Sequence, residues 1–282
     1  MKQLLLMTVL VTAFACTNQT KQESTENNQS TQAQKTPPKF QNKGHKLVYK
    51  VVQKTGDYQK LKSLKDVVYT YTYRTPDKKE DISVEKYIFD GEMSYGQYKK
   101  HERTLPKLEG EITQGYNGKN FWLKHKNEYI TDKETLKRVT FTRKTNFYWF
   151  AMMQKLLDPG INYKHLRQET LNDTLYDVVE ITYNVPEGQA SDTYHLYINV
   201  KTSLIDQFLF TVVDYNVVKK PLIMRVTYKS IDGVMIPAYR KYTKATWKGE
   251  VLDQKWVEEI AEDIKFNQNI PKTIFEAKTT SK

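Results

Sequence analysis

The sequence predicts a mainly β domain of the α+β class: a single large curved antiparallel sheet, or unclosed β-barrel, with helices plugging or lidding its concave face. Short runs of alternating apolar and polar residues, separated by turn residues, cover most of the chain and are typical of half-buried strands. Tyrosine occurs 20 times and suits a pleated surface. One stretch does not alternate, because residues 147–153 are all apolar or aromatic, which indicates a buried helix.

Residues 1–15 have the order of residues found in a lipoprotein signal peptide. Lys2 is followed by a largely apolar segment, and the small residues Ala13 and Ala15 come just before Cys16, the only cysteine. This order resembles a bacterial lipoprotein signal, although such signals usually have Leu where Ala13 stands. We therefore expect a lipid anchor, with palmitate-type acyl chains, at Cys16. The alternative is an ordinary secretory signal in which Cys16 is incidental.

The lipidated Cys16 is expected to begin a disordered polar tether over residues 16–39. Of the 23 residues from Thr17 to Lys39, 15 are Ser, Thr, Asn or Gln, and none is aromatic. Such a segment cannot bury enough apolar surface to offset the entropy lost on ordering. The folded domain is then expected over residues 40–276, with a disordered tail at 277–282.

Within this domain, apolar residues spaced three and four apart predict a helix over residues 43–64 that breaks at Gly56. A second helix is expected to begin at Asp132, with an interruption at 140–145, and to continue into the buried segment 146–157. Residues 251–264 are assigned to a last strand, although their acidic pairs also suit a helix. The other expected strands are 67–73, 84–89, 93–98, 111–116, 121–124, 176–184, 192–200, 205–215, 223–230 and 234–247.

A flat sheet of roughly nine to eleven strands would expose long edges, so we expect it to curl towards a barrel. A barrel of that strand number is wider than its own side chains fill, so the 146–157 helix is expected in its hollow. Large apolar side chains of this segment are the candidates for contact with a hydrophobic ligand or for a lid; the alternative is that they are only core. They are Phe147, Trp149, Phe150, Met152, Met153, Leu156 and Leu157.

These features resemble the periplasmic lipoprotein carrier and receptor superfamily of LolA-like and LolB-like proteins. Over roughly residues 43 to 275, the chain is also similar to a group of uncharacterised Bacteroidota-type outer-membrane lipoproteins, through the segments 147–160 and 197–202 and the pair Ile236-Pro237. The resemblance implies a half-barrel whose hollow holds acyl chains, and hence a hydrophobic ligand.

Catalytic patterns are not evident. The sequence has no Gly-rich phosphate loop and no nucleophile elbow, and the five histidines lack the spacing of a metal site. Three acidic pairs could serve glycoside cleavage, but each lies among polar residues and is expected on a solvated face. We predict no catalysis, no metal and no cofactor. The residues considered were His45, His101, His125, His165, His195, Glu80-Asp81, Glu258-Glu259 and Glu262-Asp263.

The formal charge of +11 would suit an anionic partner, but the basic residues are scattered, and nucleic-acid binding is not expected. The predicted function is a monomeric, lipid-anchored envelope protein, located at the outer membrane, that binds an acyl chain, a lipid or a lipoprotein. The alternative is a structural or interaction lipoprotein with a filled core, whose basic surface contacts anionic glycan or lipid headgroups. A hydrolase is the third hypothesis.

Overall fold

The computed structural model describes residues 38–277. The chain divides into residues 1–39 and a compact unit from Phe40 onward, and the elements below belong to that second unit. The predicted signal peptide, Cys16, the tether up to residue 37 and the tail from residue 278 lie outside the described residues. Within the described range, no helix combines the length and apolar character needed to cross a membrane.

Between residues 38 and 277, thirteen strands form one antiparallel sheet in the order β6-β5-β4-β3-β2-β1-β13-β12-β11-β10-β9-β8-β7. The two end strands, β6 and β7, do not pair with each other, so the barrel is unclosed, as the sequence predicts. The strands are β1 (Asp66–Arg74), β2 (Glu80–Ile88), β3 (Met93–His101), β4 (Ile112–Tyr116), β5 (Phe121–His125), β6 (Glu128–Ile130), β7 (Ile161–Leu171), β8 (Thr174–Tyr183), β9 (Thr193–Asn199), β10 (Ile205–Val212), β11 (Val217–Ile231), β12 (Val234–Lys244) and β13 (Val257–Phe266).

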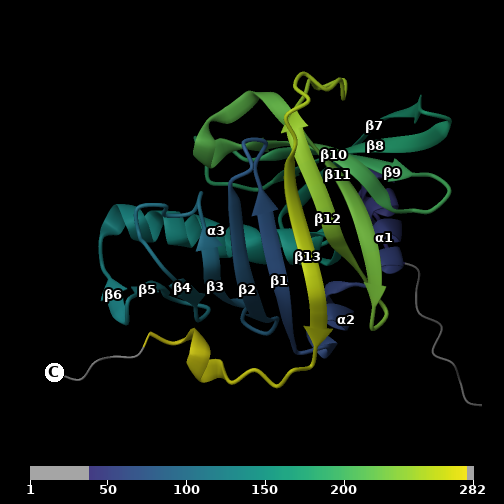
Figure 1. Ribbon diagram of the computed structural model, residues 1–282. Helices are drawn as coiled ribbons and strands as arrows, with labels where there is room; N and C mark the ends of the chain where they lie inside the picture. Colours follow the sequence, from purple (N-terminus) through teal and green to yellow (C-terminus); the bar gives the residue numbers. More distant parts are fainter. Residues whose placement is uncertain (1–37, 278–282) are drawn as a thin grey trace, which may run out of the picture. The chain divides into compact units, whose positions relative to one another are not determined.

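Neighbouring strands of this sheet follow one another in the sequence, and the pair β1 and β13 is the exception. The first strand pairs with the last in the middle of the sheet, with Thr72 opposite Ile260, so the two ends of the folded unit are joined by backbone hydrogen bonds (Figure 1). The segment 251–264 was predicted as a strand, and β13 confirms its second half. Gly91, in the turn between β2 and β3, has φ 83°, a conformation that favours glycine.

Two strands escaped the prediction, β6 and β7. The first has only three residues, too few to show alternation. The second carries Lys164, His165 and Arg167, and it lies at the edge of the sheet, where charged side chains reach water. Edge position therefore removes the apolar pattern by which a strand is recognised.

The N-terminal helical segment consists of α1 (Lys43–Thr55) and α2 (Tyr58–Ser63), which confirms the break at Gly56. This glycine has φ 85°, and a Cβ atom there would lie 2.9 Å from Cγ1 of Val234. The Asn42 side chain caps α1 by accepting a 3.0 Å hydrogen bond from the amide of His45.

The central helix is α3 (Lys133–Lys155), which Asp132 caps as predicted by accepting from the amide of Thr135 at 2.8 Å. The predicted interruption at 140–145 is wrong, because α3 is continuous there. The hydroxyl groups of Thr140 and Thr142 donate hydrogen bonds to the backbone carbonyls of Leu136 and Arg138, each at 2.9 Å. Packing of this turn against the sheet outweighs the weak helix propensity of threonine.

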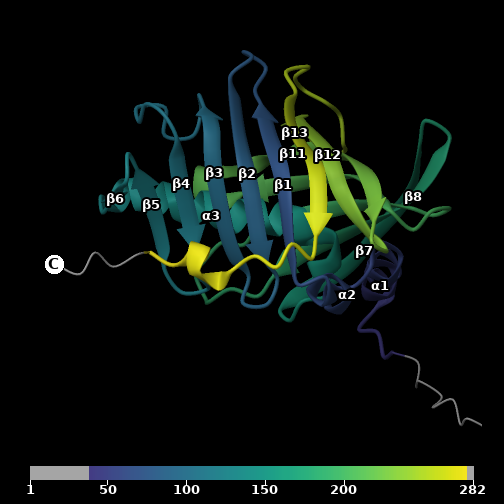
Figure 2. The ribbon, with the colours of Figure 1, turned by 60° about the horizontal axis from the view of Figure 1, so that its bottom comes forward.

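The sheet wraps around α3, which crosses its strands on the concave side (Figures 1 and 2). Met152 and Met153 belong to a buried cluster with α1 and strands β7 to β11. Phe147 and Phe150 belong to a second cluster with α2, β1, β2, β12 and β13. Because each side of the helix meets its own core, the apolar run 147–153 is enclosed by the fold, as the sequence predicts.

Candidate functional site

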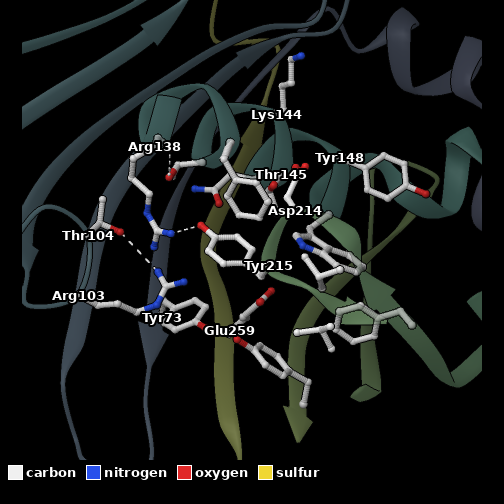
Figure 3. Close-up of a pocket in the computed structure, with 18 of the residues that line it drawn as sticks. Tyr73, Arg103, Thr104, Arg138, Lys144, Thr145, Tyr148, Asp214, Tyr215 and Glu259 are labelled. Atoms are coloured by element: carbon white, nitrogen blue, oxygen red, sulfur yellow. Dashed lines mark hydrogen bonds between the residues drawn. The ribbon is translucent and has the colours of Figure 1, made fainter. Parts of the chain in front are cut away.

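A cavity of about 1110 Å³ lies between α3 and the concave face of the sheet (Figure 3). Its helix wall runs from Glu134 to Trp149, a length of about 22 Å at the helical rise of 1.5 Å per residue. The other walls come from β1, β2, β3 and the loop after β3, and from β9 to β13 with the segment between β10 and β11. Strands far apart in sheet order therefore meet around one space because the sheet is curved.

A buried ion pair fixes the position of α3 against β2 and β3. Arg143 and Glu85 are both fully buried and are joined by bonds of 2.7 and 3.1 Å, and Tyr98 accepts a further bond of 3.0 Å from the guanidinium. Burial alone would lower the pKa of Arg143, but the Glu85 carboxylate raises it above its ordinary value. Gly96 leaves the space for the guanidinium, since a Cβ atom there would overlap it.

The inner part of the cavity is aromatic and apolar. The ring of Trp149 lies 5.3 Å from that of Phe210, and Phe210 is stacked on Tyr194 at 6.1 Å. Arg240 holds the α3 backbone beside this wall, since it donates a 2.7 Å bond to the carbonyl of Trp149. Flat, rigid side chains of this kind present a large apolar area to a ligand.

Three polar groups of the side chains that line this part of the cavity have no partner among the described residues. Among residues 38–277, the hydroxyls of Tyr71 and Tyr194 and the indole N–H of Trp149 make no hydrogen bond, although these side chains are nearly buried. Burial raises the pKa of both tyrosines well above the ordinary value of 10, so they stay neutral hydrogen-bond donors at physiological pH. Such groups need a partner from water or a ligand.

The polar end of the cavity carries two arginines and an exposed tyrosine. The guanidinium of Arg103 lies 3.9 Å from the ring centre of Tyr73, and that of Arg138 donates a hydrogen bond to the hydroxyl of Tyr215. Tyr215 also contacts Phe141 of α3 edge-on, at 4.7 Å. Figure 3 shows both arginines on the same side of the space. The cavity is thus polar towards the N-terminal half of α3 and aromatic near Trp149.

Of the seven residues predicted to contact a ligand or form a lid, Trp149 lines the cavity. The other six pack into the core: Phe147 and Phe150 in one cluster, Met152, Met153 and Leu156 in the other, and Leu157, partly buried, against the latter. Their packing matches the alternative of core residues, and contact with a ligand stays a prediction for all seven. Cys16 lies outside the described residues.

Most of the cavity lining was not identified from the sequence. The alternation in 68–73 placed Tyr71 and Tyr73 on one face, and the alternation in 192–200 did the same for Tyr194, so these faces were detectable. Arg103 lies in a loop and Arg138 in a polar stretch of helix, where no pattern marks one side as inward. Their position depends on how the sheet curves.

Among the histidines and acidic pairs considered, His101, Asp81 and Glu259 have clear structural partners. The Nδ1 and Nε2 atoms of His101 lie 2.9 and 2.6 Å from two backbone carbonyl oxygens. Asp81 and Glu259 are buried, so the expectation of a solvated face is wrong for both; backbone amides bind the first and Arg240 binds the second. Over residues 38–277, no group of three or more His, Cys, Asp or Glu side chains could hold a metal ion.

No protein-family model and no curated protein matches this sequence. Similar solved structures include a domain of the outer membrane lipoprotein-sorting type from Vibrio parahaemolyticus, with 10% identity, a TM-score of 0.48 and coverage of 83% of this chain and 96% of that one. A LolA superfamily protein from Nitrosomonas europaea has 15% identity, a TM-score of 0.46 and coverage of 82% and 97%. A DUF1329 family protein from Desulfovibrio piger has 13% identity, a TM-score of 0.46 and coverage of 83% of this chain and 95% of that one.

These structures include the LolA superfamily that the sequence resembles. With TM-scores below 0.5 and identities of 15% or less, the likeness transfers neither ligand nor activity to this chain. The narrower resemblance to Bacteroidota-type lipoproteins stays a prediction.

Proposed function

We propose that this protein is a monomeric envelope protein, tethered at the outer membrane by a lipid on Cys16, that binds one amphiphile in the cavity beside α3. The hydrocarbon part of the ligand, from an acyl chain, a lipid or the acylated end of a lipoprotein, lies against Trp149 and Phe210. The observation that carries this proposal is a cavity of about 1110 Å³ with an aromatic inner wall and a polar end.

The size and chemistry of the cavity support this ligand class. Small-molecule sites are clefts of about 300–1,000 Å³, mostly apolar and with a few polar groups that orient the ligand. Here the lining follows α3 from Glu134 to Trp149, a length that suits a chain rather than a compact molecule. Removing a chain from water against the aromatic wall supplies affinity of about 25 cal/mol per Å² of apolar area buried.

The proposal contains no catalytic step, because the buried acids at the cavity already have structural partners. Glu259 is bound by Arg240 at 2.7 Å, and Asp81 accepts the amide proton of Arg103 at 2.9 Å. The alternative, an interaction lipoprotein with a filled core, fits less well, since the space beside α3 is not occupied by side chains.

Native mass spectrometry of the purified protein tests this function. We expect an added mass that matches a lipid and that organic solvent extracts. In the variant Thr145→Trp, a larger side chain occupies the cavity next to α3 and should reduce the bound fraction. The matched control is Thr135→Trp, on the same helix but outside the cavity.

The control should retain the lipid. Equal lipid content in both variants at equal thermal stability would place the ligand elsewhere, and a protein that neither carries lipid nor takes up an added alkyl compound would overturn the proposed function.

A further inference from the structure

Arg103 keeps most of its hydrogen-bonding capacity free. A guanidinium has five N–H donors. The guanidinium of Arg103 lies 3.5 Å from the hydroxyl of Thr104 and 3.6 Å from a carboxylate oxygen of Asp81, and the second distance is longer than a hydrogen bond. The carboxylate oxygens of Asp81 instead accept hydrogen bonds from the backbone amides of Arg103 and Thr104, at 2.9 to 3.2 Å. The aromatic face of Tyr73 supports the guanidinium from one side and leaves its edge open.

Arg138 has even fewer partners. Its guanidinium donates to the hydroxyl of Tyr215 and lies 5.6 Å from the centre of that ring. Among the residues that the structure describes, no carboxylate forms an ion pair with it. Tyr215 therefore holds the guanidinium of Arg138, whereas Tyr73 and Asp81 hold that of Arg103.

Among the described acids near the cavity, Asp81 forms an ion pair of 3.6 Å with Arg103, and none of the others is paired with either arginine. Glu259 forms an ion pair with Arg240. Asp192 accepts hydrogen bonds from the amide of Val213 at 2.8 Å and from the hydroxyl of Thr211 at 3.1 Å. Glu134 and Asp214 are exposed, where water and salt screen their charges. The two guanidinium groups lie at the same end of one cavity, as Figure 3 shows, so Arg138 keeps an unmatched charge there and both groups keep free N–H donors.

We infer that Arg103 and Arg138 form a two-armed site for the oxyanion headgroup, phosphate or carboxylate, of the amphiphile whose chain lies against Trp149. This inference rests on the proposed function and adds the charge and the direction of the ligand. Guanidinium groups bind planar or tetrahedral oxyanions through paired N–H donors. Arg138 precedes Trp149 by eleven residues, about 16 Å along the helix, so head and chain contacts are separated along one axis.

Calorimetric titration with three probes tests the headgroup: decyl phosphate, decanol and inorganic phosphate. Decyl phosphate should bind at least about tenfold more tightly than decanol, because charge-assisted hydrogen bonds add to the shared chain contacts. Arg138→Gln and Arg103→Gln should each weaken decyl phosphate binding about tenfold and leave decanol binding unchanged. The matched control, Arg225→Gln, removes an exposed arginine outside the cavity and should change neither.

Equal affinity for decyl phosphate and decanol, or arginine variants without effect, would overturn the headgroup site while leaving the proposed function intact. Inorganic phosphate binding as tightly as decyl phosphate would also overturn it, since the anion would then be free rather than part of an amphiphile. If neither alkyl probe binds, the proposed function itself fails. Thermal unfolding is measured for each variant, and should Arg103→Gln not fold, Arg138→Gln decides alone, because its tyrosine partner is exposed.

Discussion

Replacing Arg143 by Met should be among the most destabilising single changes in this protein, because the Arg143–Glu85 pair joins α3 to the sheet. Both side chains are 0% exposed, and the pair is bonded at 2.7 and 3.1 Å. Removing one member leaves an uncompensated buried charge, at a cost of about 3–5 kcal/mol. For a domain of this size that lowers the melting temperature by roughly 6 to 20 °C.

Urea unfolding of the wild type, Arg143→Met, Glu85→Met and the double variant measures this cost and the coupling between the two side chains. The double variant should lose less stability than the sum of the two single losses, because neither charge is left without its partner. Lys79→Met, in the exposed Lys79–Asp77 pair, is the control and should leave stability nearly unchanged. Additive losses, or an Arg143→Met variant as stable as the control, would refute the claim that this pair fixes α3.

Three further predictions concern packing and charge. Gly115→Ala should destabilise the protein by about 1–3 kcal/mol in urea unfolding, since the added Cβ would overlap the Trp122 ring; unchanged stability would mean that the ring moves freely. Phe150→Ala should cost about 3–5 kcal/mol in the same assay, because Phe150 lies in the core; an unchanged decyl phosphate affinity in this variant would exclude Phe150 as a ligand contact. Burial lowers the pKa of His195 below 6.5, so the unfolded state takes up more protons and stability should fall as pH drops below 6.5, by at most about 1.4 kcal/mol per pH unit. His195→Gln should remove this pH dependence in thermal melts between neutral and mildly acidic pH, and an unaltered slope would exclude His195 as its source.

The sequence predicted an element of the fold where a residue type or a run of residues has a single structural consequence. Gly56 interrupts the helical pattern of residues 43–64, and the apolar run 147–153 needs burial on all sides, so both features could be expected without a structure. The strand β7 and the continuity of α3 at Thr140 depend on tertiary neighbours, which a local pattern does not contain.

The cavity was harder to predict than the fold for the same reason. Sequence reasoning pointed to the apolar run 147–153 of α3, but most of this run fills the core, and only Tyr148 and Trp149 of it line the cavity. Arg103 and Arg138 come from a loop after β3 and from the polar start of α3, and they meet there because the sheet curves. Which polar side chain turns inward is set by that curvature rather than by its neighbours in sequence.

The central claim is that a hydrocarbon chain lies beside Trp149, and fluorescence quenching measures this directly. Decyl phosphate brominated at the methyl end of its chain should quench tryptophan emission on binding, and more strongly than the same compound brominated next to the phosphate. The quenching should disappear in Trp149→Phe, which keeps an aromatic ring at the site. Saturating probe without quenching, or quenching that persists in Trp149→Phe, would contradict the account.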